Sequence, residues 1–552
     1  MTTLSRTSAL TPVPSTNRPA PSIDRSSGAA RLIVDGAPFY IRGVELHNST
    51  SSSAEAFAHG LRVAEAVHAN TVLASVTWEM IQPEEDRFDF TSVERMVHQA
   101  RSTGTRLVLL WFGAWKNGAS SYAPGWVKRE WHRFPPCVLE DGRISDGRVS
   151  NTLSPFGETD LDLDAFVALM SFLEEFDEAE RTVLMVQIEN EIGLLGDSRD
   201  RSAAATRAFD APIPASLRAA LAHRPGFSAE EPELCWKDVH VDELGRDEAF
   251  MAWGYASHVQ KLAAAARTRS ALPFFVNAWL DSDLDITIPG FAVAGGQKPG
   301  MYPSGGPLPR VADVWTTVAV DVDLFAPDVY FGDLDTIYSS FTAMSGGLFI
   351  PEQRTGEDGV AAAYLAYGEY QAIGVSPFGV DSRTDPELAA LTDAYRAIGS
   401  VATLLTDAAG KRPPTRGFRL GDGQESATLA FGDVRIVVTQ ASAFGVDDTG
   451  NFGYGLVISL AEDEFVFAGR GFHAIFESAN PAEQVLIEGV SELPHDGAAA
   501  DGRRLNGDET GGGTRVIHPP IDRVVSPFPI AASHAHSGIS QVTVYRMPRT
   551  SP

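Results

Sequence analysis

The sequence lacks the features that define several common classes of protein. Only two cysteines, Cys137 and Cys235, occur among 552 residues, too few for a disulfide framework or a cysteine-based zinc site. No apolar run approaches the roughly 18 residues of a membrane span. Basic residues are scarce, since 44 Lys and Arg face 72 Asp and Glu, a formal net charge of −28. Such an acidic surface repels phosphate and anionic lipid, so we expect no nucleic acid and no membrane partner.

Targeting and cofactor signals are missing as well. Residues 1–29 are rich in Ser, Thr and Pro without a continuous apolar core, so we expect a disordered tail rather than a signal peptide. This composition favours a cytoplasmic protein. No H-E-x-x-H motif, calcium-loop spacing or phosphate loop occurs, so no metal and no cofactor is expected. The sequence leaves open whether the chain forms a homo-oligomer.

What the sequence contains, over residues 30–404, is an alternation of short apolar runs and amphipathic helical stretches. The eight strand candidates lie within 31–46 (a hairpin and then a strand), 70–78, 106–115, 182–191, 273–280, 322–330, 347–353 and 375–381. Most of them are separated by helical segments such as 53–69 and 163–178. Repeated strand-then-helix order indicates a parallel sheet, and eight such units predict an α/β fold of the (β/α)₈ or TIM barrel type.

Beyond about residue 405 the pattern changes to alternation with period two between Gly, Asp and Asn turns. The clearest runs are 426–440, 454–470, 473–478 and 541–547, while 495–513 is typical of a mobile loop. We therefore predict a C-terminal β-sandwich-like domain over residues 405–552. Because it has no cluster of carboxylates, we expect it to pack against the barrel as a stabilising or dimer-forming element. An accessory sugar-binding role is the alternative.

Polar residues recur at the carboxyl ends of the predicted barrel strands, which form the catalytic face in such barrels. They are Glu45, His47, Trp78, Glu79, Trp115, Lys116, Asn117, Asn190, Glu191, Asn277, Trp279, Tyr330 and Glu352. A carboxylate at the end of a buried strand is costly unless it is paired or used. A ring of them at equivalent positions therefore predicts an active site.

Two of these carboxylates, Glu191 and Glu352, end the fourth and seventh strands. Hydrolysis of an acetal needs a carboxylic acid that protonates the leaving oxygen and a carboxylate that faces the oxocarbenium-like centre. Asn190 then suits a sugar hydroxyl next to the reacting carbon. Five aromatic residues suit the apolar faces of pyranose rings: Trp78, Trp111, Trp115, Trp279 and Tyr330.

The stretch "VQIENEIG" resembles the "VQIENEYG" signature of glycoside hydrolase family 35, a β-galactosidase family. "FIPEQR", with Glu352, resembles the nucleophile strand of that family, and "VTWEMIQPEEDRFDF" and "PGMYPSGGPLP" resemble a bacterial subgroup with a C-terminal β domain. The resemblance implies a retaining, exo-acting β-galactosidase with Glu191 as acid/base, Glu352 as nucleophile and Glu189 as a structural residue. It also places Asn277 and Tyr330 at strand-five and strand-six positions that contact substrate, and the expected partner is a small or oligosaccharide β-glycoside.

The sequence departs from that family at the end of the third strand, where "CAEW" is replaced by "FGAW" and the sugar-binding glutamate by Ala114. Lys116, Asn117 or Glu45 are the candidates for the missing contact. A β-glucosidase, a transglycosylase using the same two glutamates, and a catalytically silent sugar-binding barrel remain alternatives.

Several side chains have structural interpretations beside the functional one. His47 suits a core histidine as well as a substrate ligand, and Trp78 and Trp115 suit either sugar stacking or a plug at the top of the barrel. Asp197, Asp200 and Asp210 are predicted to form a solvated loop face.

Overall fold

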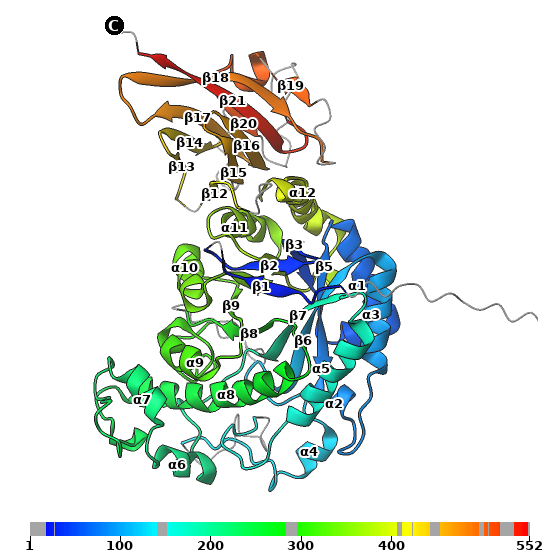
Figure 1. Ribbon diagram of the computed structural model, residues 1–552, viewed down its shortest axis with the longest axis vertical. Helices are drawn as coiled ribbons and strands as arrows, with labels where there is room; N and C mark the ends of the chain where they lie inside the picture. The colour runs from blue at the N-terminus through cyan, green and yellow to red at the C-terminus, as the bar shows by residue number, and fades with distance from the viewer. Residues whose placement is uncertain are drawn as a thin grey trace, which may run out of the picture.

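The computed structural model describes residues 18–26, 28–140, 152–282, 295–405, 411–421, 423–441, 453–495, 502–505, 507–518 and 535–549. These residues form two stacked domains, a barrel with its helices and a β-rich domain that lies against helices α11 and α12 (Figure 1).

The first domain is a closed barrel of eight parallel strands, as the sequence predicts. Its strands are β4 (Ile41–Glu45), β5 (Thr71–Thr77), β6 (Arg106–Lys116), β7 (Val183–Asn190), β8 (Phe274–Trp279), β9 (Leu324–Val329), β10 (Phe349–Gln353) and β11 (Gly374–Pro377). Nearly every residue in them is buried, because parallel strands are covered by helices on one side and by the packed interior on the other. This explains their continuous rather than alternating apolar sequence.

Helices surround this barrel on its outer side (Figure 1). They are α1 (Ala54–Ala66), α2 (Trp78–Ile81), α3 (Thr91–Thr103), α4 (Gly125–Arg129), α5 (Leu163–Asp177), α6 (Ala203–Phe209), α7 (Ala215–Leu221), α8 (Glu243–Arg267), α9 (Ala312–Val318), α10 (Leu334–Ser345), α11 (Gly356–Gly368) and α12 (Asp385–Val401). Short 3₁₀ turns occupy Thr50–Ser52, Trp236–Asp238, Pro309–Val311, Val380–Ser382 and Ala402–Leu405. In the described part of the chain, none of the helices combines the length and apolar character of a membrane span.

Local sequence explains where individual helices begin and end. Helix α12 starts with a capping box, in which Thr384 and Glu387 bond to each other's backbone N–H groups. Helix α3 ends at Gly104, whose φ of 71° is the left-handed conformation that glycine adopts without steric cost. Helix α5 buries Phe166, Leu169 and other residues at three- and four-residue spacing, which is the face it packs on the barrel.

A small antiparallel sheet closes the end of the barrel where the strands begin. It consists of β1 (Ser22–Asp24), β2 (Arg31–Val34) and β3 (Ala37–Pro38), and Leu32 and Val34 join the residues that fill the barrel interior. Strand β1 lies inside the segment predicted to be a disordered tail, so the ordered part begins earlier than expected from composition.

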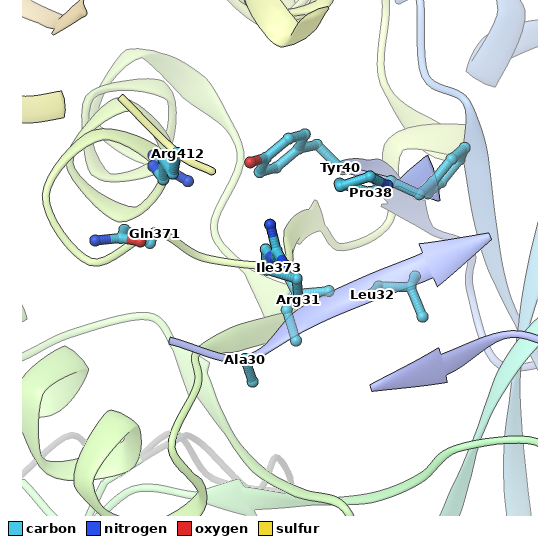
Figure 2. A pocket seen from close by; sticks show the side chains of 9 residues that line it. Ala30, Arg31, Leu32, Pro38, Tyr40, Gln371, Ile373 and Arg412 are labelled. Carbon is cyan, nitrogen blue, oxygen red and sulfur yellow. The ribbon is translucent and has the colours of Figure 1, made fainter. Parts of the chain in front are cut away.

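A cavity beside this sheet is lined by Leu32, Tyr40, Gln371, Arg412 and their neighbours (Figure 2). Its volume of about 10 Å³ leaves room for no more than about one water molecule. It is therefore too small to be a ligand site.

The second domain is a sandwich of two antiparallel sheets, as predicted. One has the order β12-β15-β16-β21-β18-β19 and the other β13-β14-β17-β20. The strands are β12 (Thr415–Leu420), β13 (Ser426–Phe431), β14 (Val434–Gln440), β15 (Gly453–Ala461), β16 (Glu464–Arg470), β17 (Phe472–Ser478), β18 (Glu483–Glu492), β19 (Arg503–Leu505), β20 (Val516–His518) and β21 (Ile539–Pro548). Strand β19 falls within the segment predicted to be a loop, and β12 and β18 were not among the predicted strands.

The six-stranded sheet of this sandwich also packs against helices α11 and α12 of the barrel. Tyr454 stacks on Tyr364 with ring centroids 5.3 Å apart. A Cβ atom on Gly368 would lie 2.5 Å from the Cα of Gly417, so the helix and strand β12 approach as closely as glycine permits. The apolar core of the barrel continues through this contact into the sheet, because Tyr454 belongs to the same buried cluster as the barrel helices.

Candidate active site

The barrel brings the sequence-predicted polar residues together at the carboxyl ends of its strands. Strand register places Lys116 beside Asn190 and places Asp328 beside Glu352. These four side chains are buried, and so are Glu45 and Glu191. Four carboxylates and one ammonium group thus lie in a water-poor environment at a single end of the barrel.

Glu191 is held by an unusual backbone turn at the end of β7. It has a φ of 45°, and Glu189 has a φ of 61°, so two non-glycine residues adopt the left-handed conformation within three positions. Such strain persists only where surrounding contacts enforce it, and it is common at functional sites. The Glu191 N–H donates to Asn277 Oδ1 at 2.9 Å, and Asn277 Nδ2 donates to Asp328 Oδ2 at 2.7 Å. Asn277 therefore connects Glu191 to the neighbouring carboxylate.

Burial and mutual repulsion favour the protonated forms of these carboxyl groups. Burial, followed by the negative charge of Glu352, raises the pKa of Glu191 to about 7. The same two causes raise the pKa of Glu45 and of Asp328 well above the usual range. Near neutral pH, Glu191 is thus poised between its acid and base forms, as a general acid/base requires.

Lys116 provides the positive charge of the cluster. Burial alone lowers the pKa of its ammonium group, but the carboxylates of Glu191, Glu352, Glu45 and Asp328 outweigh burial and raise it. The side chain therefore stays protonated and lowers the pKa of Glu191 in turn.

Glu352 is oriented by a single strong contact. The Tyr330 hydroxyl donates to Glu352 Oε1 at 2.5 Å, while Glu352 Oε2 has no hydrogen-bond partner within the protein. One carboxylate oxygen is thus fixed and the other is available to react.

Other buried polar atoms in the cluster also lack a partner within the protein. They are both carboxylate oxygens of Glu45, both amide atoms of Asn190, Asn117 Oδ1 and Asp328 Oδ1. Most buried polar atoms in folded proteins are hydrogen-bonded, so a group of orphans in one place indicates a site for a polar ligand. Hydroxyl groups, which both donate and accept, match this mixture of amide and carboxylate atoms.

The departure at the end of the third strand has a structural counterpart. Strand β6 carries a bulge, because the register moves from Trp111–Ile188 to Lys116–Asn190. Within it, the N–H groups of Ala114 and Trp115 donate to the carboxylate of Glu189 at 3.1 and 2.7 Å. The bulge lies directly before Lys116, whose ammonium group interacts with the carboxylates of the cluster.

Behind this bulge lies a buried group of Asp162, Glu189 and His258. His258 Nε2 is 3.0 Å from Asp162 Oδ1 and 3.5 Å from Glu189 Oε1. Burial lowers the pKa of His258, but the two carboxylates outweigh it and raise it to about 9. Among the described residues, these three form the group that could hold a metal ion, because their potential ligand atoms all lie within 4.8 Å of one another. A metal needs neutral imidazole, whereas this environment favours imidazolium, so the group fits an ion-paired support better than a metal centre.

The predicted aromatic contacts need correction. Trp78 and Trp115 are fully buried, and their indole N–H groups donate to Gln82 Oε1 at 2.9 Å and to the Leu153 carbonyl at 3.0 Å. Trp111 is also fully buried and donates to Asp162. These three rings fill the space around the strands and cannot stack on a sugar. Trp279 retains 5% exposure, and its N–H donates to the Gly295 carbonyl at 3.0 Å.

His47 is a partly exposed residue rather than a core histidine. Its Nε2 is 2.8 Å from Ser382 Oγ, and its ring meets the edge of Phe378 at 5.0 Å. Phe378 forms an isolated bridge with Glu45, so His47 lies at the rim, next to the cluster.

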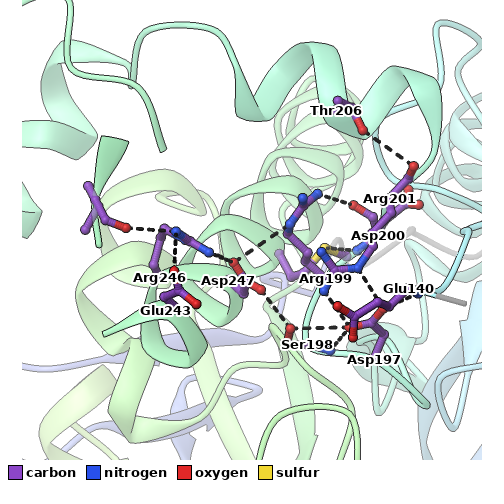
Figure 3. A network of polar contacts seen from close by, with 12 residues as sticks. Glu140, Asp197, Ser198, Arg199, Asp200, Arg201, Thr206, Glu243, Arg246 and Asp247 are labelled. Atoms are coloured by element: carbon purple, nitrogen blue, oxygen red, sulfur yellow. Dashed lines mark hydrogen bonds and ion pairs between the residues drawn. The ribbon is translucent and has the colours of Figure 1, made fainter. Parts of the chain in front are cut away.

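The loop that follows Glu191 is fixed by a polar network (Figure 3). Asp197 accepts from Arg201 Nε at 3.0 Å and from the Glu140 N–H at 2.6 Å. Asp200 is fully buried and accepts from Ser154 Oγ and from the N–H groups of Val138 and Ser202. The prediction of a solvated loop face is therefore wrong for Asp197 and Asp200; Asp210 retains about half of its side-chain exposure. The network holds the chain that leads away from the acid/base candidate.

The sequence interpretation missed Asp328, Asp162 and His258. Asp328 had a detectable signal, since it is a charged residue at the end of the apolar strand "LFAPDVY". Asp162 and His258 had none, because they come from the start of α5 and the middle of α8 and meet only in the folded barrel.

Two family models match parts of the chain. A β-galactosidase family model, that of glycoside hydrolase family 42, matches residues 48–220, and a domain of unknown function (DUF5597) matches residues 391–517. These matches support a β-galactosidase-like barrel of the glycoside hydrolases but not family 35 specifically. No curated protein matches the chain.

Several solved structures resemble this chain at low identity. A β-galactosidase from Marinomonas ef1 is 12% identical, with a TM-score of 0.44 over 67% of this chain and 61% of that one. The catalytic domain of a β-amylase from Paenibacillus polymyxa is 14% identical, with a TM-score of 0.45 over 65% of this chain and 98% of that one. A β-galactosidase from Halorubrum lacusprofundi is 14% identical, with a TM-score of 0.43 over 67% and 59%. The chain thus spans about three fifths of the length of the β-galactosidases it matches.

Proposed function

We propose that the protein is a retaining, exo-acting β-glycosidase that acts on β-galactosides, with Glu191 as acid/base and Glu352 as nucleophile. The observation that carries the proposal is the buried cluster, in which a carboxyl group with a pKa of about 7 faces a second carboxylate that has one free oxygen. Such a pair of carboxyl groups with separated roles is what acetal hydrolysis needs. The match of residues 48–220 to a β-galactosidase family adds support for the substrate.

In the first step, Glu352 Oε2 attacks the anomeric carbon while Glu191, in its acid form, protonates the leaving oxygen. Tyr330 keeps the nucleophile oriented through its bond to Oε1. Formation of the glycosyl ester removes the negative charge of Glu352, which is one cause of the raised pKa of Glu191. Glu191 therefore loses its proton more readily in the intermediate and becomes the base that activates water in the second step.

Sugar hydroxyls are proposed to bind the polar atoms that lack partners in the protein. Asn190 is free at both amide atoms, and Glu45 at both carboxylate oxygens, so each suits two hydroxyl contacts. Lys116, two positions after the Ala114 that replaces the family glutamate, is proposed to supply donors in its stead. Asn277, whose amide is already used by Glu191 and Asp328, holds the acid/base in place rather than contacting sugar.

Membership of family 35 is a more specific hypothesis than the assignment to the β-galactosidase-like glycoside hydrolases. The "VQIENEIG" motif favours family 35, while the matching family model is that of family 42.

Azide rescue tests the two roles separately. Glu352→Gly should lose turnover of aryl β-galactosides and regain it with external azide, giving the inverted product, an α-galactosyl azide, because azide attacks from the face that the nucleophile occupied. Glu191→Ala should keep activity only on substrates with good leaving groups, and azide should accelerate it. Glu84→Gln, an exposed carboxylate 72% accessible, is the matched control and should behave as the wild type. Near-normal hydrolysis of an unactivated disaccharide by both active-site variants would exclude the two-glutamate mechanism.

Parallel assays with p-nitrophenyl β-galactoside and β-glucoside decide between galacto and gluco specificity. Release of free sugar against formation of longer products distinguishes hydrolysis from transglycosylation. Binding of galactose without turnover of either substrate would instead identify a silent sugar-binding barrel.

A further inference from the structure

We infer that the enzyme binds an oligosaccharide leaving group in a groove that runs from the catalytic carboxylates to Arg419 of the C-terminal domain. The inference rests on the proposed glycosidase function and specifies its substrate class as β-galactosides with a leaving group of several sugar units. It also gives the β domain a part in substrate binding.

The groove consists of two adjoining cavities of about 550 and 220 Å³. Both are lined by Tyr330, Phe331, Gln353 and Arg354, so the two cavities are neighbours. The larger volume lies within the range of roughly 300–1,000 Å³ that is usual for small-molecule sites. The two volumes together suit a chain of sugars better than a single ring.

The groove adjoins the reaction centre through Tyr330. This residue lines both cavities, and its hydroxyl donates to Glu352. Phe378, which lines the larger cavity, bridges to Glu45 and meets His47. A leaving group that departs from the anomeric carbon over these side chains enters the larger cavity.

The chemistry of the lining fits sugars. Tyr330, Phe331 and Phe378 are partly exposed rings that can cover the apolar faces of pyranoses. Gln353 is 1% exposed, and its Oε1 has no hydrogen-bond partner within the protein although the residue lines both cavities. A buried acceptor of this kind calls for a donor, and a sugar hydroxyl provides one.

Arginine side chains line the outer part. Arg354 and Arg419 share the carboxylate of Asp358, at 2.6 and 2.5 Å, so two guanidinium groups are held side by side across the domain boundary. Arg383 lines the larger cavity and pairs with Glu387 at 3.3 Å. The guanidinium groups of Arg354 and Arg383 each carry five N–H donors, more than these pairs consume, and the remainder suit sugar hydroxyls and ring oxygens.

Arg419 is the residue that ties the second domain to the site. It lies in β12, which packs along α11, and it lines the smaller cavity. Arg416, in the same strand, pairs instead with Glu369 at 3.9 Å and does not line either cavity. The two arginines share one strand and one interface, so they form a matched pair of test and control.

The kinetic test uses p-nitrophenyl β-galactoside and the series β-1,4-galactobiose, -triose and -tetraose. In the wild type, kcat/KM should rise with chain length, and the KM for the tetraose should be the lowest. In Arg419→Ala, the ratio of kcat/KM for tetraose to that for the aryl galactoside should fall at least tenfold. In Arg416→Ala the ratio should stay at the wild-type value, and Arg419→Lys should recover part of the loss.

Two outcomes separate this inference from the proposed function. A protein that releases p-nitrophenol but shows no length dependence, or loses the dependence equally in Arg416→Ala, has no such groove. If no substrate is hydrolysed, calorimetric titration of galactotetraose into Glu352→Gln protein still decides, since binding must weaken at least tenfold on adding Arg419→Ala but not Arg416→Ala. Equal binding by the two double variants overturns the inference. Melting temperatures are measured for all variants. Values equal to that of the wild type exclude loss of the domain interface as the cause of weaker binding.

Discussion

Ionisation of Glu191 should control both activity and stability above pH 5. Its pKa is about 7 in the folded protein, because burial and the charge of Glu352 disfavour the carboxylate, against 4.5 for an ordinary glutamate. The glycosylation step needs the protonated form, so kcat/KM should fall about tenfold per pH unit once the pH exceeds about 7. The Glu191→Gln variant, assayed on a dinitrophenyl galactoside that needs no acid, should lack this alkaline decline.

The same pKa fixes the sign of a stability effect. Since the folded pKa lies above the unfolded one, the protonated carboxyl contributes fully below pH 4.5, and this contribution is lost as pH rises to about 7. A difference of that size corresponds to about 3 kcal/mol, because one pKa unit equals about 1.4 kcal/mol. The glutamine in Glu191→Gln cannot ionise. The free energy of unfolding of this variant, relative to that of the wild type, should therefore increase by up to about 3 kcal/mol as the pH rises from 4.5 to 8.

The assay is urea denaturation of both proteins at pH 4.5, 6, 7 and 8, with Glu84→Gln as the exposed control. The difference between Glu191→Gln and wild type should grow through this window and then level off, while the control should follow the wild type throughout. A difference that stays constant with pH, or an alkaline decline of activity that persists in Glu191→Gln at the same pH, would refute the assignment of the acid.

Three further changes have defined outcomes. Tyr330→Phe removes the donor to Glu352 and should lower kcat about ten- to a hundredfold at nearly unchanged KM, since a hydrogen bond to a charged group contributes about 1.5–3 kcal/mol; an unchanged kcat refutes this. Asp162→Asn removes the nearer, ionised partner of His258 and should destabilise the fold by about 3–5 kcal/mol, whereas Asp160→Asn, which breaks an exposed pair, should cost about 1 kcal/mol or less in thermal melts. Ending the chain after residue 405 uncovers the surface around Tyr364 and should give aggregated protein; a soluble barrel with normal melting would contradict the structural role of the second domain.

The sequence determined the fold class through local patterns. Apolar patterns with the period of a strand or a helix depend on neighbouring residues only, so the eight barrel strands and the sandwich could be predicted from them. Polar residues such as Glu45, Glu191 and Glu352 could likewise be assigned to the carboxyl-end face of the barrel. The composition of the N-terminal segment was misleading, because strand β1 is stabilised by pairing with β2 rather than by its own residues.

Tertiary structure alone decided which polar residues act together. Trp78 and Trp115 lie at the carboxyl ends of barrel strands, as Glu45 does, yet their side chains are packed in the core. The direction of such a side chain is set by bulges and by helix packing, and not by its position along the strand alone. His258 and Asp162 lie 96 residues apart (258 − 162), and Arg419 belongs to another domain, so no local pattern links them to the site. Charge repulsion and burial, which shift the pKa of Glu191, depend on distances that only the closed barrel defines.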